Sequence, residues 1–315
     1  MWKFVLQRSV SAVFVLFGVS VLTFLLVFFT PGDPAETILR QQMGGQTPSA
    51  EAIEQFRANQ GLNDPIPVQY VDWVLSILQG DLGQSYHSDS SVTQLIVDNL
   101  WPTFELALAG MAVALLIAVP TGVISAVHKG GRLDYGSQLA ALLGLSMPNF
   151  WLGYLLMLIF AINLSVLPTS GYGTIDQLVL PAITLGTGMA AIITRLLRSS
   201  MLEVLDEEYI RTARSKGLRE RIVVYKHTLR NALIPVITII GLQFGYLLNG
   251  AVIIEIVFQR PGLGRLLIDS IFARDYPIVQ GLVLVIAVLF VVTNFLVDVA
   301  YRYVDPRISF EGAPK

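Results

Sequence analysis

Residues 106–127 read LALAGMAVALLIAVPTGVISAV, a run without a single Asp, Glu, Lys or Arg. A helix of about 20 apolar residues crosses the hydrocarbon core of a bilayer. Five further runs along the chain have the same character, so the sequence predicts an all-α polytopic membrane protein with six transmembrane helices. We expect these helices over residues 9–32, 106–127, 138–163, 177–194, 231–254 and 276–297.

The composition agrees with a chain that faces lipid. Of the 315 residues, 54% are hydrophobic and 14% are charged, whereas a soluble domain carries about 25% charged residues. The formal net charge is −2 and the chain has no cysteine. A near-neutral chain has no basic field to hold nucleic acid, and a chain without cysteine has no disulfide or thiolate chemistry. We therefore expect contact with membrane lipid and no nucleic-acid partner.

Lys and Arg are distributed unevenly around the predicted spans. Nine of the 21 basic residues lie between residues 195 and 230, and seven more lie near the chain ends and at 129–132. Basic residues are enriched in the cytoplasmic loops of membrane proteins. The sequence therefore predicts a multi-pass protein with both termini in the cytoplasm. Residues 30–105 then form an extracytoplasmic loop, and residues 199–230 form a cytoplasmic segment.

The long first loop carries helix signals. Thr47 as N-cap, followed by Pro48, predicts a short helix that Gly61 ends. Apolar residues at helical spacing after Pro65 predict a second helix that ends at Gly80. We expect a small helical cap. It serves either as a docking surface for an external partner or as an amphipathic cover for the membrane surface and the span ends.

Motifs of catalysis and cofactor binding are missing from the sequence. The three histidines lie in separate polar segments without metal-ligand spacing, and there is no Gly-x-x-x-x-Gly-Lys-Ser/Thr phosphate loop. We therefore expect no catalytic residue, metal or cofactor on this chain, and any ATP and Mg to bind partner subunits. Charged residues are missing from the interior of every predicted span, which disfavours a stand-alone channel, an ion-coupled carrier and an integral membrane enzyme.

Small and polar residues in two spans mark a candidate pathway. Pro148 and Asn149 interrupt the third span, which predicts a kink whose opened backbone groups a neighbour or water satisfies. Gly241, Gly245 and Asn249 recur every four residues in the fifth span, which predicts either close helix packing or a face along the pathway. The candidate pathway residues are Asn149, Gln243, Gly245 and Asn249.

The cytoplasmic segment contains a short helix with its own start and stop signals. Asp206 is suited to cap a helix whose first turn is acidic and whose last turns are basic, and Gly217 is suited to end it. Tyr209 and Ala213 give a narrow face that fits a groove of another protein, although a solvated connector has the same pattern. The candidate docking residues are Glu207, Glu208, Tyr209, Arg211, Thr212, Ala213, Arg214, Lys216 and Gly217.

This segment resembles the membrane subunits of binding-protein-dependent ABC importers, in their dipeptide and oligopeptide permease branch. In that family a Glu-Ala-Ala-x-x-x-Gly loop forms the coupling helix, and residues 211–217 read Arg-Thr-Ala-Arg-Ser-Lys-Gly here. Ala213 and Gly217 match the general pattern, and the departure before Ala213 is typical of the peptide branch. Further stretches similar to that branch are Pro31-Gly-Asp-Pro34, Gly61-Leu-Asn-Asp-Pro65, Gly80-Asp-Leu-Gly83, Pro261-Gly-Leu-Gly-Arg265 and Asp305-Pro-Arg-Ile308.

The resemblance implies a type I ABC importer permease fold, with residues 1–315 as one transmembrane domain in a bacterial cytoplasmic (inner) membrane. It implies that residues 207–217 are the coupling helix, which docks on an ATPase. The implied partners are a homologous second permease subunit in a heterodimer, two ATPase subunits that bind ATP and Mg, and an extracytoplasmic substrate-binding protein. The implied cargo is a di- or oligopeptide. Glutathione, a nickel chelate or another small solute is the alternative within the same architecture.

Overall fold

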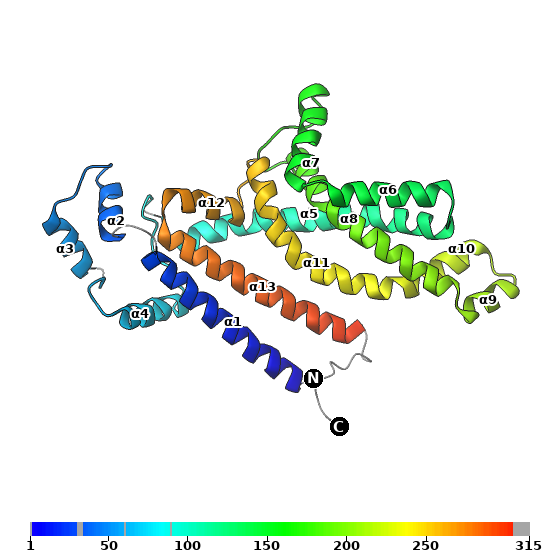
Figure 1. Ribbon diagram of the computed structural model, residues 1–315, viewed down its shortest axis with the longest axis horizontal. Helices are drawn as coiled ribbons and strands as arrows, with labels where there is room; N and C mark the ends of the chain where they lie inside the picture. The colour runs from blue at the N-terminus through cyan, green and yellow to red at the C-terminus, as the bar shows by residue number, and fades with distance from the viewer. Residues whose placement is uncertain (1, 30–33, 60, 89, 305–315) are drawn as a thin grey trace. The chain divides into compact units, whose positions relative to one another are not determined.

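The computed structural model describes residues 2–29, 34–59, 61–88 and 90–304, and nearly all regular structure in these ranges is helical (Figure 1). Two of the elements, η1 and η2, are π-helices. The elements are α1 (Trp2–Phe29), α2 (Pro34–Gln42), α3 (Ala50–Asn59), α4 (Ile66–Leu78), α5 (Val92–Val127), α6 (Arg132–Ser146), α7 (Asn149–Leu156), η1 (Met157–Asn163), α8 (Ile175–Leu205), α9 (Glu208–Ser215), α10 (Glu220–Ile222), η2 (Val223–Leu229), α11 (Arg230–Val257), α12 (Leu263–Ala273) and α13 (Tyr276–Val304).

Five helices in the described part of the chain are long and apolar enough to cross a membrane. A sixth span results if α6 and the α7–η1 segment are counted together. The predicted all-α polytopic membrane fold is therefore confirmed. The five segments are Leu6–Leu26, Val92–Val127, Ile175–Leu205, Glu220–Leu247 and Tyr276–Val297.

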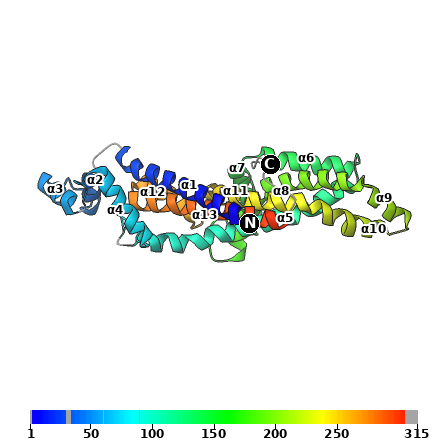
Figure 2. The same cartoon turned by 90° about the horizontal axis from the view of Figure 1, so that it is seen from below.

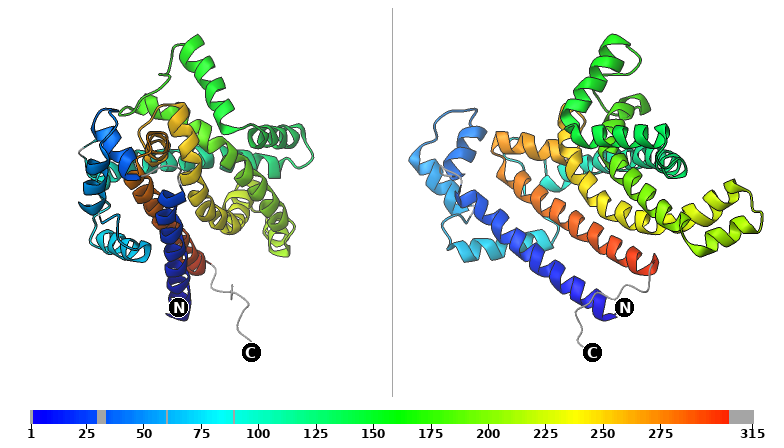
Figure 3. Two further views of the ribbon diagram at one scale, coloured as in Figure 1. Left: turned by 60° about the vertical axis from the view of Figure 1, so that its left-hand side comes forward. Right: turned by 45° about the vertical axis from the view of Figure 1, so that its right-hand side comes forward.

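The third span is broken in the middle. α6 ends at Ser146, α7 begins at Asn149, and the two helical segments meet at an angle of 106° (Figure 3). Pro148 has no N–H group to continue the helix, and it disfavours the helical conformation at Met147, which is extended with φ −83° and ψ 126°. The interruption predicted at Pro148 in the span over 138–163 is present, and it is a complete break of the helix where the sequence predicts a kink.

Two compact units make up the chain: Met1–Trp101 with Leu266–Val292, and Pro102–Arg265 with Thr293–Lys315. In the first unit, α4 packs on α1 through aromatic side chains. The Phe24 ring lies 5.4 Å from the Tyr70 ring and 5.5 Å from the Trp73 ring, measured between centroids. α4 thus covers part of a membrane span, as one of the two alternatives for this loop anticipates.

Two of the helices of the long loop, α3 and α4, occur where the sequence predicts them, whereas α2 is not predicted. α4 follows Pro65 and stops before Gly80, whose φ of +85° suits glycine. α3 begins at Ala50, and Ser49 caps it by accepting a hydrogen bond from the Ala52 N–H at 3.2 Å. The predicted cap at Thr47 is wrong by two residues, because Ser49 provides the same hydroxyl chemistry closer to the helix.

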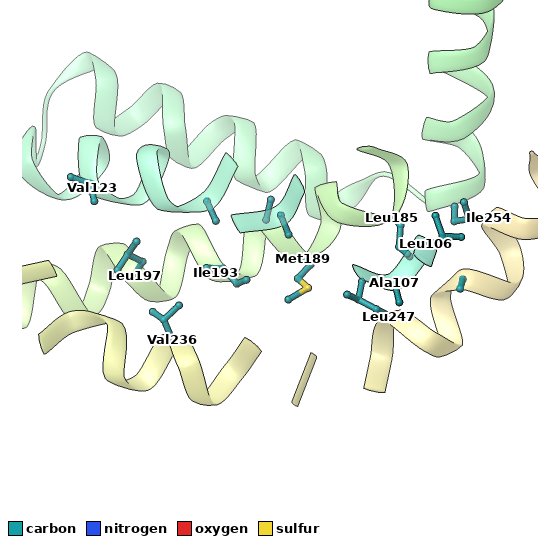
Figure 4. Close-up of a cluster of buried hydrophobic side chains, with 14 of the residues drawn as sticks. Leu106, Ala107, Val123, Leu185, Met189, Ile193, Leu197, Val236, Leu247 and Ile254 are labelled. Atoms are coloured by element: carbon teal, nitrogen blue, oxygen red, sulfur yellow. The ribbon is translucent and has the colours of Figure 1, made fainter. Parts of the chain in front are cut away.

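α8 is the central helix of the second unit and packs against α11, α6 and α7. Figure 2 also shows α6 and α8 lying side by side. Gly186 of α8 lies so near α5 that a Cβ atom there would be 2.5 Å from the Gly110 carbonyl oxygen. One apolar stripe of α8 fills the core of this unit (Figure 4), and it consists of Leu185, Met189, Ile193 and Leu197.

A buried ion pair fastens α6 to α8. The Asp134 carboxylate, 1% exposed, accepts hydrogen bonds from Arg198 Nε at 2.7 Å and Arg198 Nη2 at 2.8 Å. It also accepts bonds from Ser125 Oγ at 2.6 Å and the Gly130 N–H at 2.8 Å. These bonds hold the C-terminal part of α8 against α6 and the end of α5.

Candidate functional site

The predicted docking segment is a separate short helix at the C-terminal end of α8. Asp206 has helical dihedrals and its N–H bonds to the carbonyl groups of Glu203 and Val204, so it ends α8 and does not cap the next helix. Glu207 is extended, with φ −68° and ψ 146°, and stands at the N-cap position of α9. The prediction that Asp206 is the N-cap is therefore wrong. Gly217 follows α9 with φ +76°, as expected for a helix stop.

One face of α9 is buried in the chain itself. Ile210 and Ala213 pack with Val223 of η2 in a small apolar cluster, and Ala213 is 8% exposed. The expected outward face formed by Tyr209 with Ala213 is therefore wrong, because Ala213 lies on the inner face that seats the helix. Tyr209 is exposed, and its hydroxyl accepts a hydrogen bond from Asn231 Nδ2 at 2.8 Å.

Charged residues surround the buried face of α9. Arg214 forms a bidentate pair with Glu220, with Nη2 to Oε1 at 2.7 Å and Nε to Oε2 at 3.2 Å. The hydrogen bond to Glu220 raises the pKa of the Arg214 guanidinium, so this group stays charged. The remaining predicted docking residues are all exposed, and they are Glu207, Glu208, Arg211, Thr212, Lys216 and Gly217.

A cavity of about 220 Å³ lies beside the break between α6 and α7. Asn149 and Gln243, far apart in sequence, both line it, and the Tyr246 side chain lies at the same wall. The rest of the described lining is apolar or glycine. The second unit therefore presents two side-chain amides in an otherwise apolar hollow.

The remaining candidate pathway residues have different positions. Gly245 is buried and is not among the lining residues of this cavity. The side chain of Asn249 lies outside the described part of the chain. Gly241, which has the same four-residue spacing, packs closely, since a Cβ there would be 2.9 Å from Val297 Cγ1. Close helix packing therefore accounts for Gly241.

Both halves of the chain match known families. Residues 118–310 match the binding-protein-dependent transport system inner membrane component, and residues 1–107 match the N-terminal part of binding-protein-dependent transport system membrane components. The chain belongs to this family. It is therefore a permease subunit of a membrane transport system. The predicted resemblance to peptide-type ABC permeases is confirmed.

Relatives of this permease match it over its whole length. The glutathione transport system permease protein GsiC of Pectobacterium atrosepticum is 45% identical over 311 residues, which covers 99% of this chain and 100% of the relative. The oligopeptide transport system permease protein AppB of Bacillus subtilis is 40% identical over 321 residues, which covers 98% of this chain and 100% of the relative.

Solved structures share the fold of the permease. A chain of the inward-facing MetNI methionine ABC transporter matches with a TM-score of 0.58 at 19% identity, over 67% of this chain and 97% of that chain. A chain of an amino acid ABC transporter matches with a TM-score of 0.53 at 14% identity, over 67% of this chain and 94% of that chain. The permease therefore has the ABC importer permease fold.

The first unit of the permease contains a larger cavity, of about 1020 Å³, lined in large part by residues 81–88. The Asp275 carboxylate fixes this loop by accepting hydrogen bonds from Ser85 Oγ at 2.6 Å and the Tyr86 N–H at 3.1 Å. Burial raises the pKa of the Tyr86 hydroxyl, and the nearby Asp275 and Tyr276 raise it further. The Tyr86 hydroxyl is therefore neutral at physiological pH.

Two charged residues of the permease are buried although the sequence places them at or outside span edges. Glu255 is 0% exposed and Arg260 is 1% exposed. The stretch Pro261-Gly-Leu-Gly-Arg265 marks this region in the sequence. Apart from the Arg265 N–H, which bonds to Glu255, the partners of both residues lie about 80 to 150 positions away in the chain, so no local pattern could reveal their burial.

Proposed function

We propose that this chain is the permease subunit of an ATP-driven ABC importer and forms half of the translocation pathway for di- or oligopeptides. The observation that carries the proposal is full-length similarity, at 40–45% identity, to permeases named for oligopeptide and glutathione transport. Glutathione is a modified tripeptide, so both names refer to short peptides. A peptide is accordingly the cargo class that the relatives have in common.

The lining of the cavity beside the α6–α7 break supports a pathway for peptides. Asn149 and Gln243 offer amide groups that both donate and accept hydrogen bonds, as peptide bonds do. No charged side chain is among the described lining residues. A neutral lining with amide groups suits a cargo whose backbone is constant and whose side chains vary. In this proposal Asn149 and Gln243 contact the peptide backbone, while Gly245 and Asn249 belong to the same pathway helix.

The exposed face of α9 supports a docking role. It presents Glu208, Arg211 and Lys216 to solvent on a helix that the buried Ile210 anchors to its own chain. Charges of both signs on a firmly seated helix suit a polar groove in a partner. In this proposal residues 207–217 bind one of two ATPase subunits, which hold ATP and Mg. No cofactor binds this chain.

The proposed assembly contains two further partners. A homologous second permease completes the pathway as a heterodimer, and a substrate-binding protein delivers the peptide from outside. The membrane is the bacterial inner membrane. Residues 30–105 lie on the extracytoplasmic side, while residues 199–230 and both termini lie in the cytoplasm, because most Lys and Arg residues flank those segments.

Glutathione is the second candidate cargo. It is favoured by the 45% identity to a relative whose name states glutathione transport, against 40% for the oligopeptide permease. The two candidates differ in size range, because an oligopeptide pathway accepts chains of several lengths.

Uptake by the reconstituted complex tests the proposed function. Proteoliposomes that contain both permeases and the ATPase subunits are supplied with binding protein, ATP and either labelled di- to hexapeptides or labelled glutathione. We expect ATP-dependent accumulation of peptides that requires the binding protein. Accumulation of glutathione alone assigns the second candidate. Uptake by this chain alone, driven by an ion gradient, would overturn the proposal.

A charge reversal on α9 tests the docking role. Arg211→Glu changes an exposed residue, so we expect normal insertion but loss of the ATPase subunits on copurification and loss of uptake. Arg221→Glu reverses an exposed charge on the neighbouring α10 and is the matched control. Equal retention of the ATPase subunits by both variants would contradict the docking role.

A further inference from the structure

Residues 255–265, which comprise the turn that joins α11 to α12 and the adjoining helix ends and are called the turn below, bury two charged side chains. Glu255 is 0% exposed and Arg260 is 1% exposed. Removing an ion from water costs several kcal/mol, so a buried charge persists where fixed polar partners surround it. The partners of these two residues therefore indicate what the turn holds in place.

Glu255 fastens the turn to α5. Its carboxylate accepts hydrogen bonds from Thr103 Oγ1 at 2.6 Å and from the Arg265 N–H at 3.0 Å. Thr103 Oγ1 in turn accepts a bond from the Leu263 N–H at 2.9 Å. A Cβ atom at Gly262 would overlap the Glu255 carboxyl group, so the turn closes around this carboxylate only with glycine there.

Arg260 fastens the same turn to α5 and to the first turn of α8. Its Nη2 donates to Glu105 Oε2 at 2.7 Å, and its Nη1 donates to the Gln177 carbonyl oxygen at 3.4 Å. Its guanidinium lies 5.0 Å from the centre of the Tyr172 ring. The Gln177 carbonyl lies four residues before Pro181, which has no N–H to donate to it. Arg260 therefore donates to the Gln177 carbonyl the hydrogen bond that Pro181, which has no N–H, is unable to donate.

The turn also reaches α7. Phe258 is 1% exposed, and a Cβ at Gly153 of α7 would lie 3.2 Å from its ring. The Phe258 carbonyl accepts a hydrogen bond from the Gly171 N–H at 3.2 Å. Residues 255–265 thus contact α5, α7, the loop before α8 and the first turn of α8, all inside the second unit.

This turn lies at one end of α8 and the docking helix α9 at the other. α8 has 31 residues, so the two ends are about 46 Å apart. We propose that residues 255–265 are the fulcrum of α8: Glu255 and Arg260 hold its first turn, Pro181 is the hinge, and movement of α9 swings the rest of the helix together with α6 and the part of α5 that pack on it. Glu255 and Arg260 are then positioning residues for transport. The inference rests on the proposed function, in which an ATPase moves α9.

Hydrogen exchange on the wild-type complex tests the fulcrum directly. The complex with its ATPase subunits is compared in the nucleotide-free and the vanadate-trapped state. We expect amides in residues 258–265 and 171–178 to exchange equally slowly in both states, and those in residues 207–217 to change. Loss of protection at residues 258–265 in either state would overturn the fulcrum, since the turn would then open during the cycle.

Substitutions separate positioning from simple stabilisation. In Pro181→Ala the new N–H bonds to the Gln177 carbonyl and stiffens the hinge, so we expect uptake to fall about tenfold with ATPase activity retained. Arg260→Met leaves that carbonyl without its partner, and we expect loss of both thermal stability and uptake. In the double variant the alanine introduced at position 181 satisfies the carbonyl but Glu105 still lacks its partner, so stability should recover in part and uptake should fall below that of Pro181→Ala alone.

Each outcome decides the question. Uptake by the double variant equal to that of Pro181→Ala alone would show that Arg260 merely satisfies a carbonyl, and normal uptake by Pro181→Ala would rule out the hinge. If the wild-type complex accumulates no peptide, the proposed function fails. The exchange comparison still decides the fulcrum in that case.

Discussion

Charge is used in opposite ways on α9, which follows the C-terminal end of α8, and in residues 255–265, which hold its N-terminal end. At the C-terminal end, the charged residues of α9 are exposed, and the Arg214–Glu220 pair is 43% and 56% exposed. At the N-terminal end, Glu255 and Arg260 are fully enclosed. Exposed pairs contribute little to folding but remain available to a partner, whereas enclosed charges are costly to disturb. The comparison teaches that the charges of α9 are accessible, as the proposed docking role requires, whereas those of residues 255–265 are used within the chain.

A side chain added beside the buried Glu255 carboxylate is expected to give the largest loss of stability. Gly262→Val places a Cβ inside the Glu255 carboxyl group, so we expect loss of most folded protein. Yield and thermal midpoint in detergent measure this loss. Gly136→Ala is the matched control, because a Cβ there meets no described atom within 4 Å and alanine favours the helix. Similar yields for the two variants would break the comparison.

Removing one hydroxyl from the enclosed end should cost less. Thr103→Val deletes the donor to Glu255 and the acceptor for the Leu263 N–H, so we expect a loss of about 1–3 kcal/mol of stability. A lowered thermal midpoint of the detergent-solubilised complex measures it. Thr103→Ser keeps the hydroxyl and should behave nearly as wild type. Equal midpoints for the valine and serine variants would contradict the role of this hydroxyl.

Backbone strain at Gly217, which ends α9, is expected to give the next largest loss of stability. Gly217 has φ +76° with no described atom within 4 Å of a Cβ built there, so Gly217→Ala adds strain without a clash. We expect a cost of about 1–2 kcal/mol and a weaker response of ATPase activity to peptide. Gly217→Asn tolerates this conformation better and should be milder. A more severe defect in the asparagine variant than in the alanine variant would argue against strain as the cause.

The exposed ion pair should give the smallest effect. Arg214→Gln removes a pair that is half exposed, so we expect a stability change below about 1 kcal/mol, reduced further by salt. Thermal midpoints at low and high ionic strength measure it. A loss as large as that of Thr103→Val would abolish the contrast between the two ends of α8.

The sequence predicts the helical elements well because their signals are local. Charge-free runs predict the spans, and Pro65 and Gly80 delimit α4 correctly. The break at Pro148 is signalled too, but its angle depends on what packs against α6 and α7, which no local pattern contains. Asp206 shows the same limit. Its side chain is suited to an N-cap of α9, but α8 continues to Leu205 and Asp206 is therefore the C-cap of α8.

The candidate site is predicted less completely, because burial depends on distant partners. The position of α9 follows from its own charges and Gly217. That Ala213 faces inward follows from Val223, which belongs to a later element. The enclosure of Glu255 requires Thr103, which lies about 150 residues earlier in the chain. Long-range contacts of this kind leave no periodic trace in the sequence.

The bend at Met147 leaves α6 as a short helix. Its 15 residues extend for about 22 Å, while the hydrocarbon core of a typical bilayer is about 30 Å thick. α6 alone is therefore too short to cross such a core, and a crossing at this point needs the α7–η1 segment beyond the bend. The direction in which the chain continues through the membrane is thus set at Met147 and Pro148, between two short helices, and not along one straight helix.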